Sequence, residues 1–408
     1  MATAGIAGLC GPSFEESGLS IEEVAGRGRA IIAKRPFKED ETLFIESPLM
    51  SCQFSWNREY KYLACEYCLR SLETAEEMAC RLSSQPSIDL PLSADCCESK
   101  PSTYVKCPDC EVQYCSAPCQ QMAAERYHRG VCEGRMDAQR RELFSELKET
   151  WRNMHYPPET TNIEVLARCF SAPAESPYGQ HLFQQLELLV HGTMSEDEEF
   201  QHKLLQPNYA PQIERIHRCL QLLYGEGERN CLWLTGDRFR SLLALLGRNQ
   251  QGIGSSAFSR YVHNVEKADL PKAAKDDIDA TIDAVYAAMQ EVNGPFLDVE
   301  GVGIYHHQSR LNHSCVPNVE VSFAAGNHVL SIVAMQDINI GEEVCISYLD
   351  ECMRDRSRHS RQKHLRENYL FACTCPLCIA QEDQEDVTSD EGEEDDEDED
   401  DCVCEEDM

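Results

Sequence analysis

The sequence has no long apolar run. It contains no stretch of roughly 18 or more consecutive apolar residues, so we expect no membrane-spanning helix. The first residues, Met1 to Gly5, show no basic region leading into an apolar segment, which argues against a secretory signal. From these absences we expect a protein of the cytoplasm and/or the nucleus. No clear basic import signal decides between the two compartments.

Positive charge is also scarce. The 408 residues contain 37 Lys or Arg against 71 Asp or Glu, which gives a net charge of −34. Residues 381–408 contribute 18 acidic residues and no basic one, and subtracting these 18 charges leaves −16 for the rest. An acidic body argues against direct nucleic-acid binding and suits a basic protein as substrate.

Cysteine, in contrast, is abundant, with 23 residues. Without a secretory signal, metal ligation explains this number better than a disulfide framework. Between residues 65 and 132, seven cysteines and one histidine follow ligand spacing and make two complete sets of four, so we expect structural zinc. These residues are Cys65, Cys68, Cys107, Cys110, Cys115, Cys119, His128 and Cys132.

One gap between neighbouring cysteines of this pattern is long. It runs for 38 residues between Cys68 and Cys107, and it contains Cys96 and Cys97, which could compete as ligands.

A third cysteine cluster lies near the end of the chain. Cys373, Cys375 and Cys378 are too close together for a disulfide framework and suit a tetrahedral zinc ion. They supply three ligands, so the fourth must come from elsewhere, and Cys315 is our candidate.

Two regions of the sequence have the residue pattern of β-strands. Residues 21–50 predict a hairpin, with strands at Arg29–Ala33 and Thr42–Leu49 and a turn at Lys38–Glu41. Val329–Met335 predicts a further strand.

Residues 133–300 are mainly helical by their apolar spacing. The clearest helical patterns lie at Arg140–Trp151, Gly236–Gly247 and Asp277–Val292. The basic segment Arg354–Arg366 predicts a solvated helix face that packs its apolar side on the body.

Residues 381–408 form a low-complexity acidic segment that cannot bury enough apolar area to fold. We expect no ligand role for Cys402 and Cys404 there. The tail either keeps the protein soluble or attracts basic proteins. Affinity for a basic protein at rising salt, measured with and without residues 385–408, would decide between the two.

The motifs of residues 301–378 resemble, in their order, the SET-domain lysine methyltransferases. They are Gly301-Val302-Gly303, Asn312-His313-Ser314-Cys315, Gly341-Glu342-Glu343 with Ser347-Tyr348, and the cysteine-rich close. The ligand pattern of residues 65–132 is similar to the MYND zinc finger. Together they resemble the SET and MYND family over residues 25–378. The acidic tail and the end soon after Cys378, without an appended helical-repeat domain, point to one branch of it.

This resemblance implies an α+β fold, in which a MYND finger and a helical insert interrupt a β-rich SET domain. The implied segments are a flexible N-terminus (1–20), the first SET part (21–64), the finger (65–132), the helical insert (133–300), the SET core (301–350), a post-SET zinc region (351–380) and a disordered acidic tail (381–408). The family interleaves its finger ligands. Cys65, Cys68, Cys115 and Cys119 would hold one ion, and Cys107, Cys110, His128 and Cys132 the other. With the post-SET site, the resemblance implies three zinc ions.

The resemblance also implies S-adenosylmethionine as cofactor. Asn312 and His313 match residues that hold it, and Phe371 would stack near its adenine. Counting back from Glu41-Thr42, the family's glycine pair falls on Gly28 and Ala30, with Arg29 between them, and not on Gly26 and Gly28. Asn249 matches a cofactor contact after a helix, although a polar loop residue would look the same. Arg310 departs from the family, which usually has an apolar residue there.

Tyr348 and Tyr369 match the tyrosines that line the lysine channel of the family, with Tyr348 as the residue that orients the amine. A free lysine has a pKa of about 10.4, so the site must disfavour the ammonium form. A narrow apolar channel does this by desolvation. His313 as a general base is an alternative, but no carboxylate partner is visible in the sequence.

Two functions compete. The first is a monomeric lysine methyltransferase acting on basic proteins such as histones or ribosomal protein. The second is an inactive SET fold that recruits peptide partners through its MYND finger. The motif around Asn312 and Tyr348 favours the first, and the irregular Ala30 slightly favours the second.

Overall fold

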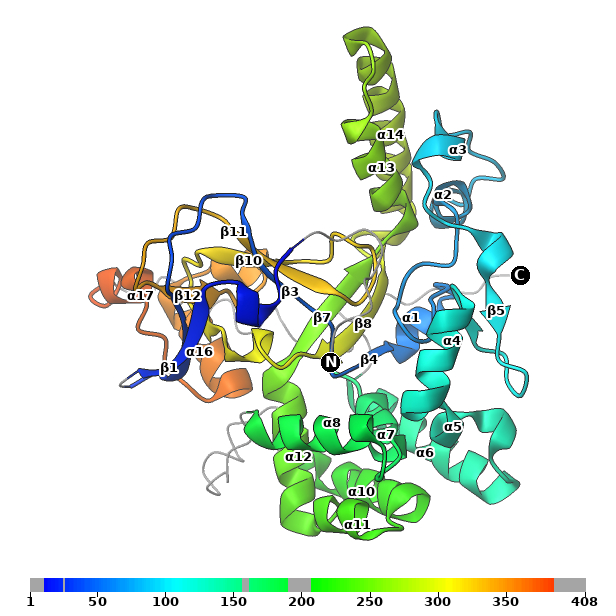
Figure 1. The fold of residues 1–408 in the computed structure, drawn as a ribbon, viewed down its shortest axis with the longest axis vertical. Coiled ribbons are helices and arrows are strands. Elements are labelled where there is room, and N and C mark those ends of the chain that lie inside the picture. Colours follow the sequence, from blue (N-terminus) through cyan, green and yellow to red (C-terminus); the bar gives the residue numbers. More distant parts are fainter. Residues whose placement is uncertain (1–10, 25, 156–160, 190–206, 385–408) are drawn as a thin grey trace, which may run out of the picture.

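The computed structural model describes residues 11–24, 26–155, 161–189 and 207–384 (Figure 1). Its mixture of helices and small sheets confirms the predicted α+β class. The predicted disorder of the acidic tail, with Cys402 and Cys404, concerns residues that lie outside the described ranges from 385 onward. Among the described helices, none has the length and apolar character needed to cross a lipid bilayer.

Three small sheets build one lobe within the described residues. Their strand orders are β1-β2-β12-β9, β10-β11-β3 and β4-β8-β7. β2 and β12 are almost entirely apolar because both faces of this central pair are covered, as in Ile31 and Val344. The strands are β1 (Leu19–Val24), β2 (Gly28–Ala33), β3 (Thr42–Glu46), β4 (Met50–Gln53), β7 (Gln250–Ser255), β8 (Val299–Ile304), β9 (Asn312–His313), β10 (Val319–Ser322), β11 (Leu330–Ala334) and β12 (Glu343–Ile346).

The predicted strands are present, but the predicted hairpin is wrong. β2 pairs with β1 and β12, whereas β3 pairs with β11 in another sheet. The residues between them cross from one sheet to the other, held where Phe37 bridges to Ile338. The second predicted strand ends early: β3 stops at Glu46, before Pro48, because proline cannot donate to a strand ladder, and β4 begins at Met50, after the predicted end.

The N-terminal expectation also needs correction. Residues 11–20, predicted as part of a flexible lead-in, contain η1 (Phe14–Glu16) and the start of β1. Phe14 stacks on His307 with ring centroids 4.1 Å apart and meets the edge of Phe44. This aromatic packing fixes the segment on the lobe that the three sheets build, which we call the SET lobe.

The finger lies beside the SET lobe and carries its long insert against a projecting helical hairpin, α13–α14 (Figure 1). Tyr261 donates to the carbonyl of Pro91, and Asn264 donates to the carbonyl of Cys96. The long insert of the finger is therefore packed against α13 and is not a loose loop. Its elements and those of the finger are α2 (Ala75–Leu82), α3 (Ser93–Cys96), η2 (Pro101–Thr103), β5 (Val105–Lys106), β6 (Gln113–Tyr114), α4 (Ala117–Ala123), η3 (Ala124–His128) and α5 (Arg129–Val131). The finger is preceded by α1 (Ser55–Glu59) and followed by η4 (Glu133–Arg135).

The remaining chain is helical where the apolar spacing predicted helices. The pattern at 236–247 continues through Gly247 to Asn249, so the glycine lies inside the helix and does not end it. The helices are α6 (Ala138–His155), α7 (Glu164–Ser171), α8 (Pro177–Leu188), η6 (Pro207–Tyr209), α10 (Ala210–Tyr224), α11 (Glu228–Trp233), α12 (Gly236–Asn249), α13 (Ala257–Lys267), α14 (Lys272–Asn293), η7 (Gln308–Arg310), α15 (Glu351–Arg354), α16 (Arg358–Tyr369) and α17 (Pro376–Ala380).

One buried arginine joins three parts of the fold. Arg168 of α7 is 2% exposed and forms an ion pair with Glu66 of the finger, with Nη2 2.6 Å from Oε1. Its Nη1 donates to the carbonyl of Ser51 in β4 and to the hydroxyl of Tyr127. The helical insert, the finger and the SET lobe therefore share one charged contact.

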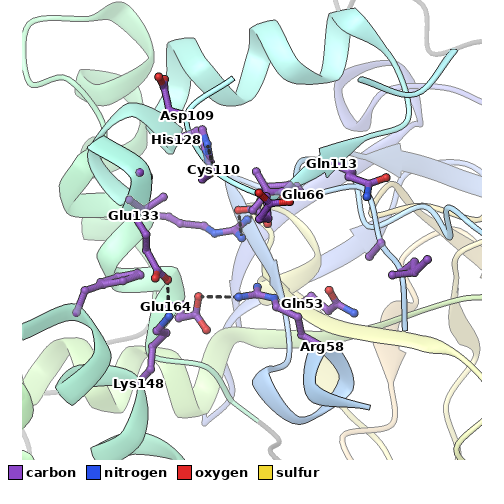
Figure 2. A pocket seen from close by; sticks show the side chains of 18 of the residues that line it. Gln53, Arg58, Glu66, Asp109, Cys110, Gln113, His128, Glu133, Lys148 and Glu164 are labelled. Atoms are coloured by element: carbon purple, nitrogen blue, oxygen red, sulfur yellow. Dashed lines mark hydrogen bonds and ion pairs between the residues drawn. The ribbon is translucent and has the colours of Figure 1, made fainter. Parts of the chain in front are cut away.

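A cavity of about 610 Å³ borders this contact between the finger, α6 and α7 (Figure 2). Two further ion pairs line it: Arg58 with Glu164 at 3.5 Å and Lys148 with Glu133 at 2.5 Å. Of these three pairs, Arg168–Glu66 joins the helical insert to the finger, Arg58–Glu164 joins α1 to α7, and Lys148–Glu133 lies within the insert.

We expect Glu66→Gln to lower the free energy of unfolding by about 3–5 kcal/mol, because it leaves the charge of Arg168 buried without its partner. Arg152→Ala is the control, since it removes the exposed ion pair with Glu59 and should cost less than about 1 kcal/mol. Urea denaturation measures both. Equal, small losses would contradict the role given to Arg168.

Candidate active site

A cleft of about 460 Å³ lies in the SET lobe. It is bounded by the β1–β2 turn, by the end of α12, by the segment from η7 to β9, by Tyr348 just after β12 and by the segment that follows α16. Of the residues predicted to bind cofactor or substrate, it brings together all but one. Those that line it are Gly28, Arg29, Asn249, Asn312, His313, Tyr348, Tyr369 and Phe371.

Ala30 is the exception. It is fully buried in β2 and does not line the cleft. Gly26 lines it instead, and both Gly26 and Gly28 have positive φ angles, of 76° and 66°. Glycine adopts such angles without the strain that a Cβ would bring. The turn at the cleft is therefore Gly26-Arg27-Gly28, because β1 pairs Val24 with Gly28 and places the turn before β2. The cofactor contact predicted for Gly28 and Ala30 stays a prediction.

β9 passes beside β12 in the parallel direction, with Asn312 next to Cys345 and His313 next to Ile346. The side chain of Asn312 donates to Glu343 Oε1 at 2.8 Å. Arg27 Nε lies 3.2 Å from the other oxygen of Glu343. Sequence reasoning missed both Arg27 and Glu343, which lock the glycine turn onto this crossing.

His313 is buried and uses both ring nitrogens inside the protein. Its Nδ1 accepts from the backbone N–H of Tyr348 at 2.9 Å, so the ring proton must be on Nε2. Nε2 lies 3.3 Å from the sulfur of Cys315. A histidine held this way positions Tyr348 and the cysteine, which argues against the alternative that it acts as a general base.

Three aromatic rings form one wall of the cleft. The centroid of Tyr348 lies 4.8 Å from that of Tyr369 and 6.2 Å from that of Phe371. The hydroxyl of Tyr348 donates to the carbonyl of Leu311 at 2.6 Å. Burial raises the pKa of both tyrosines, so both phenols stay neutral. The wall is thus apolar, with one oriented hydroxyl.

The end of α12 adjoins this wall. Asn249 is buried, and its side chain donates to the carbonyl of Leu245 at 3.0 Å within the helix. Arg248 donates to the carbonyl of Tyr369 at 2.8 Å and so holds the aromatic segment against this helix. The cofactor contact predicted for Asn249 stays a prediction.

The loop before β9 depends on a half-buried acid, Glu46, that sequence reasoning also missed. The two oxygens of Glu46 accept the backbone N–H groups of His306, His307 and Gln308 at 2.8–2.9 Å. Burial raises the pKa of Glu46 to about 7, and the three N–H groups act against that rise. The end of β3 thereby shapes the segment that leads to Arg310 and Asn312.

Cys315 meets the three C-terminal cysteines, as predicted. The four sulfurs lie within 4.8 Å of one another, and Cys315 is 3.6 Å from Cys378 and 4.0 Å from Cys373. Four sulfurs at about 2.3 Å from a tetrahedral zinc ion would be roughly 3.8 Å apart, so the set fits zinc.

The basic helix beside this cluster is not simply solvated. Arg361 of α16 is 2% exposed, and its Nη2 donates to the sulfur of Cys378 at 3.7 Å. Gln362 bonds both backbone groups of Cys373. Lys363 and Arg366 are exposed and Leu365 is buried, which fits the predicted solvated face with an apolar side on the body. The packed side also carries Arg361 and Gln362, because a cluster of four thiolates needs nearby N–H donors and positive charge.

The finger ligands group as the resemblance implied. Cys65, Cys68, Cys115 and Cys119 form one set, and Cys107, Cys110, His128 and Cys132 the other. The ring Nε2 of His128 faces the sulfurs of its set. Cys96 and Cys97 belong to neither group in the described part of the chain. All three sets are complete, so they could hold three structural zinc ions.

Comparison with known proteins agrees with this geometry. Residues 28–349 match the SET domain family. Protein-lysine N-trimethyltransferase SMYD5 from Gallus gallus is 44% identical, and the alignment covers 94% of this chain and 91% of that protein. The Homo sapiens protein of the same name is 42% identical over 95% of this chain and 91% of its own length.

A shorter match reaches another branch. Histone-lysine N-methyltransferase SMYD3 from Homo sapiens is 43% identical over 26% of this chain and 22% of that protein. The longer matches confirm the predicted branch, that of SET and MYND domain-containing protein five. The chain therefore belongs to the SET-domain family and, within it, to the SET and MYND domain lysine methyltransferases.

Proposed function

We propose that the protein transfers the methyl group of S-adenosylmethionine to the side-chain amine of a lysine in a basic protein. One observation carries the proposal. A single cleft joins the tyrosine wall, Tyr348 and Tyr369, to the Asn312–His313 segment and to an open glycine turn.

The cleft suits the cofactor in size and chemistry. Its volume of about 460 Å³ lies within the ~300–1,000 Å³ typical of small-molecule sites. A Cβ built on Gly28 would meet no atom within 4 Å, so the turn borders open space. When bound, S-adenosylmethionine supplies the methyl group on a positively charged sulfur. The faces of Tyr348 and Phe371 attract such a cation.

The tyrosine wall prepares the amine. Burial among Tyr348, Tyr369 and Phe371 disfavours the ammonium form, which lowers the pKa of an entering lysine from its usual ~10.4. The Tyr348 hydroxyl donates its hydrogen bond to the carbonyl of Leu311, so its oxygen can accept an N–H from the amine. That contact would turn the amine's lone pair toward the methyl group.

The identity of the substrate rests on charge. An acidic body and an acidic tail favour basic partners, with histones or ribosomal protein as candidates. The names of the relatives, histone-lysine and protein-lysine methyltransferases, support a protein lysine as acceptor, and the name of the longer matches supports trimethylation. The inactive-adaptor alternative has less support, because the cleft keeps both tyrosines and the Asn312–His313 segment.

We expect Tyr348→Phe to lower the rate of methyl transfer by about 10²–10³-fold, since it removes the hydroxyl that orients the amine. Incorporation of labelled methyl into core histones and ribosomal protein measures it, and calorimetry should show unchanged cofactor affinity. Tyr60→Phe is the control, because Tyr60 is an exposed tyrosine outside the cleft. Cofactor binding by the wild type without turnover on any basic protein would support the adaptor instead.

Cysteine substitution tests the post-SET zinc site. We expect Cys378→Ser to reduce the zinc content from three ions per chain to two and to weaken cofactor binding about 10–100-fold, because Tyr369 and Phe371 lose their anchor. Elemental analysis and calorimetry measure the two effects. Cys352→Ser, on the exposed surface of α15, should change neither. Three ions retained in the Cys378 variant would refute this ligand set.

A further inference from the structure

Four arginines line the cleft: Arg27, Arg29, Arg248 and Arg310. Among the described residues that line it, Glu23 is the one carboxylate, and it lies on the exposed edge strand β1. The cleft wall therefore carries an excess of positive charge, although the whole protein is strongly acidic.

Two of these arginines are accounted for by the fold. Arg27 pairs with Glu343 and donates to the carbonyl of His313 at 3.1 Å. Arg248 donates to the carbonyl of Tyr369. Both side chains hold pieces of the cleft together.

Arg310 forms no ion pair with the described residues. It is 8% exposed, and within the described residues its hydrogen bond runs from Nη1 to a neutral group, the carbonyl of His306, at 2.5 Å. The charge of Glu46 acts on Arg310 and raises its pKa, but the Glu46 carboxylate already accepts three backbone N–H groups and makes no direct contact with the guanidinium. A guanidinium this buried is costly without a directly bonded anion.

Arg29 makes the imbalance larger. It stands on the same cleft wall, and its side chain forms no hydrogen bond or ion pair with the described part of the chain, although Glu23 lies opposite it in the β1–β2 ladder. Burial and the charge of Arg29 both lower the pKa of Arg310. Two neighbouring guanidinium groups that face one cavity form a receptor for an anion, and a carboxylate can bond such groups in a bidentate manner.

We propose that Arg310, together with Arg29, receives the α-carboxylate of the methyl donor. This inference rests on the proposed function, because the carboxylate is the one anionic group of S-adenosylmethionine. The pair fixes the amino-acid end of the donor at the η7 side of the cleft. It also makes the site select donors and products that carry a carboxylate.

Calorimetry with two ligands tests the inference. S-adenosylhomocysteine keeps the carboxylate, whereas 5′-methylthioadenosine lacks it. We expect Arg310→Met to weaken binding of S-adenosylhomocysteine by about 10–100-fold, the range of one or two charge-assisted hydrogen bonds, and to leave the affinity for 5′-methylthioadenosine unchanged. Arg310→Lys should recover part of the loss. Arg218→Met, on the outer surface of α10, should change neither affinity.

The two ligands separate a carboxylate contact from a structural role. Equal weakening for both ligands, or for neither, would overturn the inference. Unchanged 5′-methylthioadenosine binding shows that the variant is folded. A wild type that binds S-adenosylhomocysteine but transfers no methyl group would refute the proposed function and leave the assignment of Arg310 in force. A wild type that binds neither ligand would contradict both the proposed function and the assignment of Arg310.

Discussion

The active site depends on one cross-link, the meeting of Cys315 with Cys373, Cys375 and Cys378. Cys315 follows directly from the β9 strand, whereas the other three thiols end the described fold, so a metal ion shared among them would close a loop of about sixty residues. Tyr369 and Phe371 lie just before these thiols, and Tyr348 packs against the same cluster. The aromatic wall therefore exists where it does because the cysteines hold the C-terminal segment over the crossing of β9 and β12.

Buried polar contacts transmit that arrangement through the lobe. His313 joins the cluster to Tyr348, with one ring nitrogen facing the sulfur of Cys315 and the other accepting the tyrosine's backbone N–H. Glu343 ties the β9–β12 crossing to the glycine turn through Asn312 and Arg27. Each contact satisfies groups that would be costly to leave unpaired in the interior, so the site is rigid before any ligand enters. Arg310 is the exception, because it lines the cleft and forms no ion pair with the described residues.

Much of the fold could be read from the chain, because its signals are local. Ligand spacing gave the zinc sets, apolar periodicity gave α6, α12 and α14, and the motif around Asn312 gave the centre of the cleft. What failed depended on contacts between distant segments. The hairpin of β2 with β3 did not form because β3 found its partner in β11, far along the chain. The turn at the cleft is Gly26-Arg27-Gly28, because the register of β1 on β2, and not the distance from Glu41, decides where the turn lies.

The sequence by itself determined which chemistry is present: thiols at metal spacing, two tyrosines, a glycine-rich turn and an acidic surface. These follow from residue type and short-range spacing, which the chain carries in any conformation. The tertiary structure alone decided which side chains share an environment. It buried Arg361 against the cysteine cluster, committed both nitrogens of His313, gave Glu46 three backbone donors and left Arg310 lining the cleft without an ion pair among the described residues. Such properties depend on burial and on partners that lie from 4 to 260 residues apart, and no local pattern encodes them.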